Sequence, residues 1–307
     1  MAASGDGGAD MEVEAFRRLY PARFYQRYLD AAVRPDARLL NRARSTSISL
    51  GPVPTADGSA LVKVGNTTML AGVKLEVMTP SSEGPDLGQV VVEFHMPPIC
   101  SPQSRPGRPA EAACTITEQL TNALKSSELV DLHELSIAPG KAAWMAYLDI
   151  YCLDADGSLL DAALLASVSA LAHLQIPSVA MTEEGTVIPA LPETGISNHL
   201  SNDKHLQQPT VSEQRRLKLG AIPWSLTCAL YKKHVLADPT AEEETVLHTI
   251  LTVIIDSSGR LVAFYKPGGS IPATTNIIQE CISLAKRRSK ELQRSLDEAI
   301  TQYESET

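Results

Sequence analysis

The stretch DGSALVKVGNTTMLAGVKLEVM, residues 57–78, contains two β-branched, strand-like runs. Turn signals flank these runs: ADG at 56–58 precedes the first, and GN at 65–66 separates the two. We therefore predict two consecutive strands joined by a tight turn, which places a β-sheet in the first half of the chain.

Further strands and helices follow on both sides of this stretch. We predict strands at STSISLG, QVVVEFHM and AWMAYLDIYCLD, a helix from Ala110 to about Ser126, and a buried, alanine- and leucine-rich helix after ADGSLLD. The second half has predicted strands at IPWSLTCALY, VLHTILTVIID and RLVAFYK, and a helix from about Thr275 to Tyr303. Strand runs followed by helices in both halves predict an α+β architecture.

The same patterns predict a domain organisation. Residues 1–10 are expected to be disordered, and residues 11–32 to form an amphipathic helix, because aromatic and leucine side chains recur there at helical spacing. Residues 33–185 form the first predicted domain, and the polar residues 186–220 a connector. Residues 221–307 form a second domain that ends in the long helix.

Composition excludes several classes of protein. The 307 residues are 44% hydrophobic and 21% charged, with no apolar run close to the roughly 20 residues that a membrane span needs. The first residues lack the features of a secretory signal. Five scattered cysteines without a C-x-x-C pair favour reduced thiols in the cytosol or nucleus over a disulfide framework or a zinc site. We predict neither a metal nor another cofactor.

Charge is distributed unevenly along the chain. The net charge of −9 argues against a general nucleic-acid coat. Eight arginines nevertheless lie between Ala15 and Arg44, and a second basic cluster runs from Lys286 to Arg294. These clusters are either solvated helix faces or contacts to phosphates or acidic partners, for which arginine is well suited.

Four acids lie in seven residues of the segment ADPTAEEE, residues 237–244: Asp238, Glu242, Glu243 and Glu244. They are either a metal site or a solvated turn between strands. Metal-assisted phosphoryl chemistry needs carboxylates that converge on one cation. Consecutive glutamates point in different directions in a strand or a helix, which favours the turn.

Seven motifs in order carry a resemblance that covers roughly residues 25–305. They are RPDAR (34–38), DGSALVKVGNTTMLAGVK (57–74), PPICSPQSRPGRP (97–109), APGKAAW (138–144), CLDADGSLLDAALLA (152–166), ADPTAEEE (237–244) and KPGGS (266–270). Together they resemble the RNase PH family and, within it, the ring subunits of the eukaryotic RNA exosome. The resemblance implies an RNase PH-type fold, which is ribosomal protein S5 domain 2-like, with mixed sheets and packed helices in two sub-domains.

The resemblance also implies a site, and two departures from it. Active members use an aspartate pair and an arginine that grips phosphate. Asp238 stands at one aspartate position, and the partner is expected about six residues earlier, where this chain has Lys232. Leu160 stands where active members have the arginine. Without a second carboxylate and a phosphate grip, in-line transfer loses positioning and charge stabilisation. We therefore predict a catalytically silent chain with a vestigial Asp238.

A ring subunit implies partners. These are other RNase PH-like subunits in a hetero-hexameric ring, cap subunits with RNA-binding domains, an associated catalytic ribonuclease and single-stranded RNA, in nucleus, nucleolus and cytoplasm. Arg105 and Arg108 are the candidate RNA contacts, because a proline-stiffened loop presents them before a helix; inter-subunit salt bridges are the alternative. Arg34, Arg38, Arg42 and Arg44 are predicted to contact neighbouring subunits or RNA, with subunit contacts favoured.

Two other functions remain open on the sequence. One is a phosphorolytic 3′-to-5′ exoribonuclease, acting alone or through a composite site with a neighbouring subunit. The other is a stand-alone RNA-binding module, which should show exposed aromatic side chains among lysines and arginines. Aromatic residues are only 5% of this chain and lie mostly on apolar faces, which disfavours the module.

Overall fold

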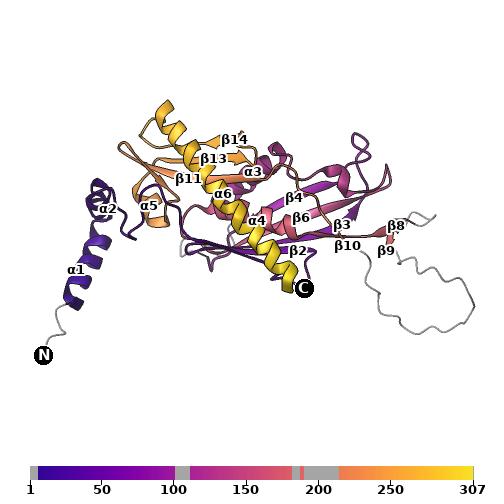
Figure 1. Ribbon diagram of the computed structural model, residues 1–307, viewed down its shortest axis with the longest axis horizontal. Coiled ribbons are helices and arrows are strands. Elements are labelled where there is room, and N and C mark those ends of the chain that lie inside the picture. Colours follow the sequence, from indigo (N-terminus) through magenta and orange to yellow (C-terminus); the bar gives the residue numbers. More distant parts are fainter. Residues whose placement is uncertain (1–5, 101–110, 182–186, 190–213, 307) are drawn as a thin grey trace, which may run out of the picture.

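Two main sheets, two short two-stranded sheets and the helices packed on them make up the described part of the protein in the computed structural model, which covers residues 6–100, 111–181, 187–189 and 214–306 (Figure 1). The α+β architecture predicted from the sequence is confirmed. Within the described residues, none of the helices is both long enough and apolar enough to cross a membrane.

The larger sheet belongs to the first half of the chain. Its strands run in the order β1-β2-β3-β6-β4, and β5 pairs with β6. All neighbours are antiparallel except β4 and β6, which are parallel. The bounds are β1 Thr46–Leu50, β2 Gly58–Val64, β3 Thr67–Met78, β4 Gln89–His95, β5 Ser136–Ala138 and β6 Ala142–Asp154.

The hairpin of β2 and β3 forms where the sequence predicts it. Val64 pairs with Thr67, so Gly65 and Asn66 form a two-residue turn. Gly65 has a φ of +59°, a conformation that favours glycine, and a Cβ there would meet the Arg44 side chain at 2.3 Å. The glycine thus serves the turn and also leaves room for Arg44.

The smaller sheet has the order β12-β11-β13-β14, and all its strand pairs are antiparallel. Its bounds are β11 Pro223–Tyr231, β12 His234–Ala237, β13 Ile250–Asp256 and β14 Leu261–Tyr265, with a short helix α5, Ala241–Val246, after β12. The last helix, α6, Thr275–Glu306, buries Cys281, Leu284, Leu292 and Leu296. It packs against β1 and β11 and so contacts both sheets (Figure 1).

Helix α4, Leu159–His173, lies between the two sheets. Eleven of its residues are buried, and it contacts β2 and β3 on one side and β11 on the other. An apolar helix surrounded in this way joins the two halves in one continuous core. Helix α3, Glu111–Ser126, packs on β4 and α4, and a 3₁₀ turn, Leu132–Leu135, precedes β5.

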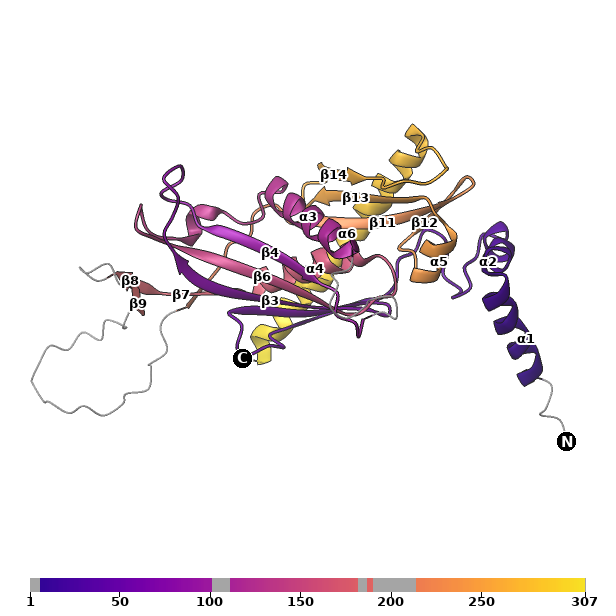
Figure 2. The ribbon, with the colours of Figure 1, turned by 180° about the vertical axis from the view of Figure 1, so that it is seen from behind.

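The N-terminal region departs from the prediction. One helix over 11–32 was expected, but two form, α1 Asp6–Leu19 and α2 Pro21–Asp30, because Pro21 begins a new helix. Residues 6–10, expected to be disordered, are part of α1. Figure 2 shows α1 extending away from the sheets, whereas α2 lies beside α5.

Short strands occupy the described parts of the connecting region. They are β7 Gln175–Pro177, β8 Val179–Met181, β9 Val187–Pro189 and β10 Gln214–Arg216, of which β7 pairs with β10 and β8 with β9. The β7–β10 pairing returns the chain to the end of α4 before the second sheet begins.

Candidate functional site

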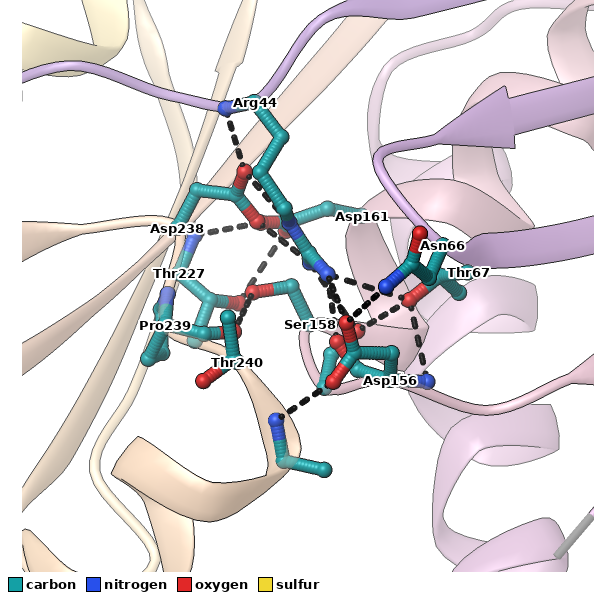
Figure 3. A network of polar contacts seen from close by, with 12 residues as sticks. Arg44, Asn66, Thr67, Asp156, Ser158, Asp161, Thr227, Asp238, Pro239 and Thr240 are labelled. Atoms are coloured by element: carbon teal, nitrogen blue, oxygen red, sulfur yellow. Dashed lines mark hydrogen bonds and ion pairs between the residues drawn. The ribbon is translucent and has the colours of Figure 1, made fainter. Parts of the chain in front are cut away.

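The candidate site lies where the two sheets meet. The start of α4, the β2–β3 turn and the segment between β12 and α5 converge there, and Arg44 lies among them (Figure 3). Asp238, the predicted vestigial residue, is 2% exposed and follows β12 directly. Its backbone has a φ of +51°, and its N–H donates to the Thr227 carbonyl over 2.8 Å.

Both carboxylate oxygens of Asp238 are engaged by Arg44. Oδ2 accepts from the Arg44 backbone N–H at 2.7 Å and from Nε at 3.0 Å, and Oδ1 accepts from Nη2 at 2.7 Å. Burial acts to raise the pKa of Asp238, but the hydrogen bonds and charge of Arg44 outweigh it, so the pKa lies below its usual value. Asp238 is therefore held ionised by a cation of its own chain.

Arg44 also binds the turn that begins α4. Its Nη1 donates to the Asp156 carbonyl and its Nη2 to the Gly157 carbonyl at 3.3 Å. Because Asp156 and Gly157 belong to the first half of the chain and Asp238 to the second, one guanidinium links the two halves.

The three glutamates of the acid cluster point to different partners. Glu242 accepts from the Tyr25 hydroxyl at 2.6 Å and from Arg17 Nε at 2.9 Å, which attaches α1 and α2 to α5. Glu243 is buried and closes a capping box with Thr240 at the start of α5. The four acids point to different partners and do not converge on one point. They do not form the solvated turn that the sequence suggested either, because Asp238 and Glu243 are each 2% exposed and the three glutamates belong to helix α5.

Glu244 takes a third direction, toward the N-terminus of α4. Its Oε1 accepts from the Ser158 backbone N–H at 2.8 Å. The Ser158 side chain makes no cap of its own, so Glu244 supplies the negative group that a helix N-terminus favours. Burial raises the pKa of Glu244 to about 7.

Asp161 is a site residue that sequence reasoning missed. It lies in the first turn of α4, and its carboxylate accepts from the Thr227 N–H at 2.6 Å and the Thr227 hydroxyl at 3.1 Å. Burial raises its pKa to about 6. The signal was present, since an aspartate interrupts the apolar run SLLDAALLA, but only the fold brings it near Asp238 and Glu244.

The predicted interface arginines divide into two groups. Arg34 is 0% exposed and lies 3.1 Å from Glu243, and Arg44 is 7% exposed. Their assignment to subunit interfaces was wrong, because both side chains pair with acids inside this chain. Arg38 also pairs internally, with Asp36, and is 13% exposed. Arg42 is exposed and has no acidic partner among the described residues. Arg105 and Arg108 lie outside the described residues.

An open pocket of about 860 Å³ borders the site. Arg17, Arg38, Arg42, Arg44 and Arg288 line it, together with the acids Asp36, Asp156, Glu242 and Glu291. Because most of these charges pair with one another, Arg42 remains the cation most available to a second molecule.

The two departures from the active pattern have different outcomes. Leu160 is 6% exposed in the first turn of α4, next to Asp161 in the sequence. Lys232 instead lies in the β11–β12 turn, where its Nζ contacts Asp30 at 2.7 Å. Lys232 lies five residues along the chain from Thr227 beside Asp238, which is roughly 16 Å at about 3.3 Å per residue. Position 232 was therefore the wrong place to expect a partner acid, whereas Asp161 and Glu244 lie close enough for the charge of Asp238 to contribute to their raised pKa.

Comparison with known proteins gives consistent matches. Residues 42–177 match domain 1 of the 3′ exoribonuclease family, and residues 221–288 match its domain 2. The exosome complex component Rrp42 of Methanopyrus kandleri is 31% identical over 87% of this chain and 91% of its own. The exosome complex component rrp43 of Schizosaccharomyces pombe is 29% identical over 89% of this chain and 94% of its own. Among solved structures, an Archaeoglobus fulgidus exosome with RNA bound to the active site has a TM-score of 0.74 at 27% identity, covering 92% of this chain and 98% of the other.

Proposed function

The chain belongs to the 3′ exoribonuclease, or RNase PH, family, and from this we propose that it is a non-catalytic subunit of an RNA exosome ring. The predicted resemblance and the RNase PH-type fold are confirmed. The motifs resemble the ring subunit ribosomal RNA-processing protein 43, and the S. pombe relative is named exosome complex component rrp43.

The names of the relatives support the ring role. Two solved structures with TM-scores above 0.7, one of them described as an archaeal exosome core, cover more than nine tenths of this chain. The proposed partners are other RNase PH-like subunits in a hetero-hexameric ring, cap subunits, an associated catalytic ribonuclease and single-stranded RNA. In this proposal the particle processes ribosomal RNA and degrades other RNAs in nucleus, nucleolus and cytoplasm.

One observation supports the proposal that the chain is non-catalytic. The charged side chains of the candidate site are already paired with other groups of the same chain. Arg44 donates hydrogen bonds to both carboxylate oxygens of Asp238, and Glu244 accepts a hydrogen bond from the Ser158 N–H at the N-terminus of α4. Leu160 supplies an alkyl chain where the resemblance implies an arginine that grips phosphate. Arg44 is therefore already neutralised by a carboxylate of the chain, and the position of the phosphate-binding arginine is apolar, which opposes phosphoryl transfer.

The test is phosphorolysis by the full-length chain. We expect no nucleoside diphosphate from labelled single-stranded RNA with inorganic phosphate and Mg²⁺, while an active family member under the same conditions releases it. Release that disappears in Asp238→Asn would contradict the proposal. Release that persists in this variant would point to a contaminating nuclease, which a second purification step would remove.

A second candidate function is a composite site with a neighbouring subunit. Arg42 favours it, because this exposed arginine lines the pocket beside the site without an acidic partner among the described residues. If this chain lends Arg42 to a neighbour, Arg42→Ala will slow phosphorolysis or RNA binding by the assembled ring, and Arg294→Ala on the exposed face of α6 will not.

A further inference from the structure

A cluster of potential metal ligands lies on the outer face of the larger sheet, away from the candidate site. Glu93 and His95 belong to β4, and Asp149 belongs to the adjacent β6 (Figure 2). Val92 and Phe94 of β4 are buried in the core. Since successive strand residues point to opposite faces, Glu93 and His95 point outward together.

The strand register holds the three side chains together. Glu93 pairs with Asp149 in the parallel ladder of β4 and β6, and His95 lies two residues further along the same face of β4. His95 Nε2 is 3.6 Å from Glu93 Oε2 and 4.0 Å from Asp149 Oδ1. All three ligand atoms lie within 4.8 Å of one another, and in the described part of the chain no other group of three His, Cys, Asp or Glu side chains does so.

Within the described residues, no lysine or arginine pairs with the two carboxylates of this cluster. Two carboxylates on neighbouring strands repel each other, since strands lie only about 4.8 Å apart. Among the described residues, His95 is the only basic side chain within 4.0 Å of either carboxylate. A bound divalent cation would remove this repulsion.

The His95 ring is already oriented for such a role. It stacks on Tyr151 of β6, with ring centroids 4.7 Å apart and an angle of 23° between the planes. The stack limits rotation of the ring while Nε2 faces both carboxylates. A ligand held in place before binding loses less conformational entropy when the ion arrives.

We propose that Glu93, His95 and Asp149 bind a divalent transition-metal ion, with Zn²⁺ as the best match. One imidazole nitrogen and two carboxylate oxygens suit Zn²⁺, with water or a group from another molecule at the fourth position. Metal–ligand distances of about 2.0–2.2 Å put tetrahedral ligand atoms about 3.4 Å apart. The side chains therefore need to move by about 1 Å or less, which these partly exposed carboxylates can do by rotation. The ion would join the edge strand β4 to the central strand β6.

The test is a metal titration of the full-length chain, freed of any affinity tag and of bound metal. Isothermal titration with Zn²⁺, and Co²⁺ absorption as a spectroscopic reading of the ligand set, should show one site per chain. His95→Gln should weaken Zn²⁺ binding at least about a hundredfold, because it removes one of three ligands. The matched control is His234→Gln, an exposed histidine outside the cluster, which should bind as the wild type does.

Thermal unfolding gives a second, independent reading. Zn²⁺ should raise the Tm of the wild type and of His234→Gln, because binding to the folded state alone stabilises it, and should not raise that of His95→Gln. A wild type that binds no Zn²⁺ at micromolar metal would overturn the proposal, as would equal binding by His95→Gln. Neither reading depends on ring assembly or on RNA.

Discussion

At the scale of single residues, the acid that looks catalytic is part of an internal ion pair. Asp238 and Arg44 come from different halves of the chain, and both are buried. Breaking a buried pair leaves one charge uncompensated, which is more destabilising than losing a surface pair.

We expect Asp238→Asn to lower the free energy of unfolding by about 3–5 kcal/mol, because it leaves the Arg44 guanidinium without its carboxylate. The RNA decay rate of an assembled particle that still folds should not change. Urea unfolding and a decay assay measure the two quantities, with exposed Asp86→Asn as the control. A hundredfold slower decay in a folded Asp238→Asn particle would show that Asp238 is catalytic.

Glu244 should make stability depend on pH. Burial raises its folded-state pKa from 4.5 to about 7, so the folded protein binds this proton more tightly than the unfolded chain. This contribution is fully present below about pH 4.5 and is lost as the pH rises through 7. Between pH 5 and pH 8, the wild type should therefore lose about 2–3 kcal/mol of stability relative to the neutral Glu244→Gln. If the difference in unfolding free energy between the wild type and Glu244→Gln is the same at both pH values, the Glu244 carboxylate does not titrate in this range.

Arg105 and Arg108 remain a prediction from the sequence. If they contact the RNA backbone, replacing both with alanine should weaken binding of single-stranded RNA by the ring and reduce the salt dependence of that binding. Arg287→Ala, in the second basic cluster, is the comparison. Wild-type affinity of the Arg105 and Arg108 variant at low salt would remove both from the RNA path.

At the scale of elements, local sequence patterns were sufficient to predict several of the turns and helices. The Gly65–Asn66 turn and the apolar α4 both form where their patterns predict them. The prediction of a single N-terminal helix was wrong. The helical spacing of the aromatic residues continues through Pro21, but this proline ends the first helix and is the first residue of a second one.

Helix α2 is held by a small core of its own, which packs its apolar side chains against Ala229, Leu236 and Leu247 of the second half. Leu29 is 0% exposed there, so Leu29→Ala should cost about 2–5 kcal/mol and speed hydrogen exchange in α2. The same substitution at Leu19, which is 71% exposed, should cost less than about 0.5 kcal/mol. Equal effects at the two positions would mean that α2 does not depend on this core.

At the scale of the whole molecule, the sequence predicted the fold and the family but not how the site is built. Asp161 and Thr227 lie 66 residues apart and meet only because α4 packs on β11. Spacing along the chain misplaced the partner acid at Lys232, since a hairpin turns that residue away from Asp238. The arginines of residues 34–44 look like an external basic surface in the sequence, yet Arg34, Arg38 and Arg44 pair with the chain's own acids.

The most direct test of the account is the native mass and composition of the particle that holds this chain, isolated gently from its own cells. We predict a particle several times heavier than the 33.0 kDa chain that contains other RNase PH-like proteins. A free monomer or a homodimer would contradict the ring, and it would reopen the question of what the buried acids around Arg44 do.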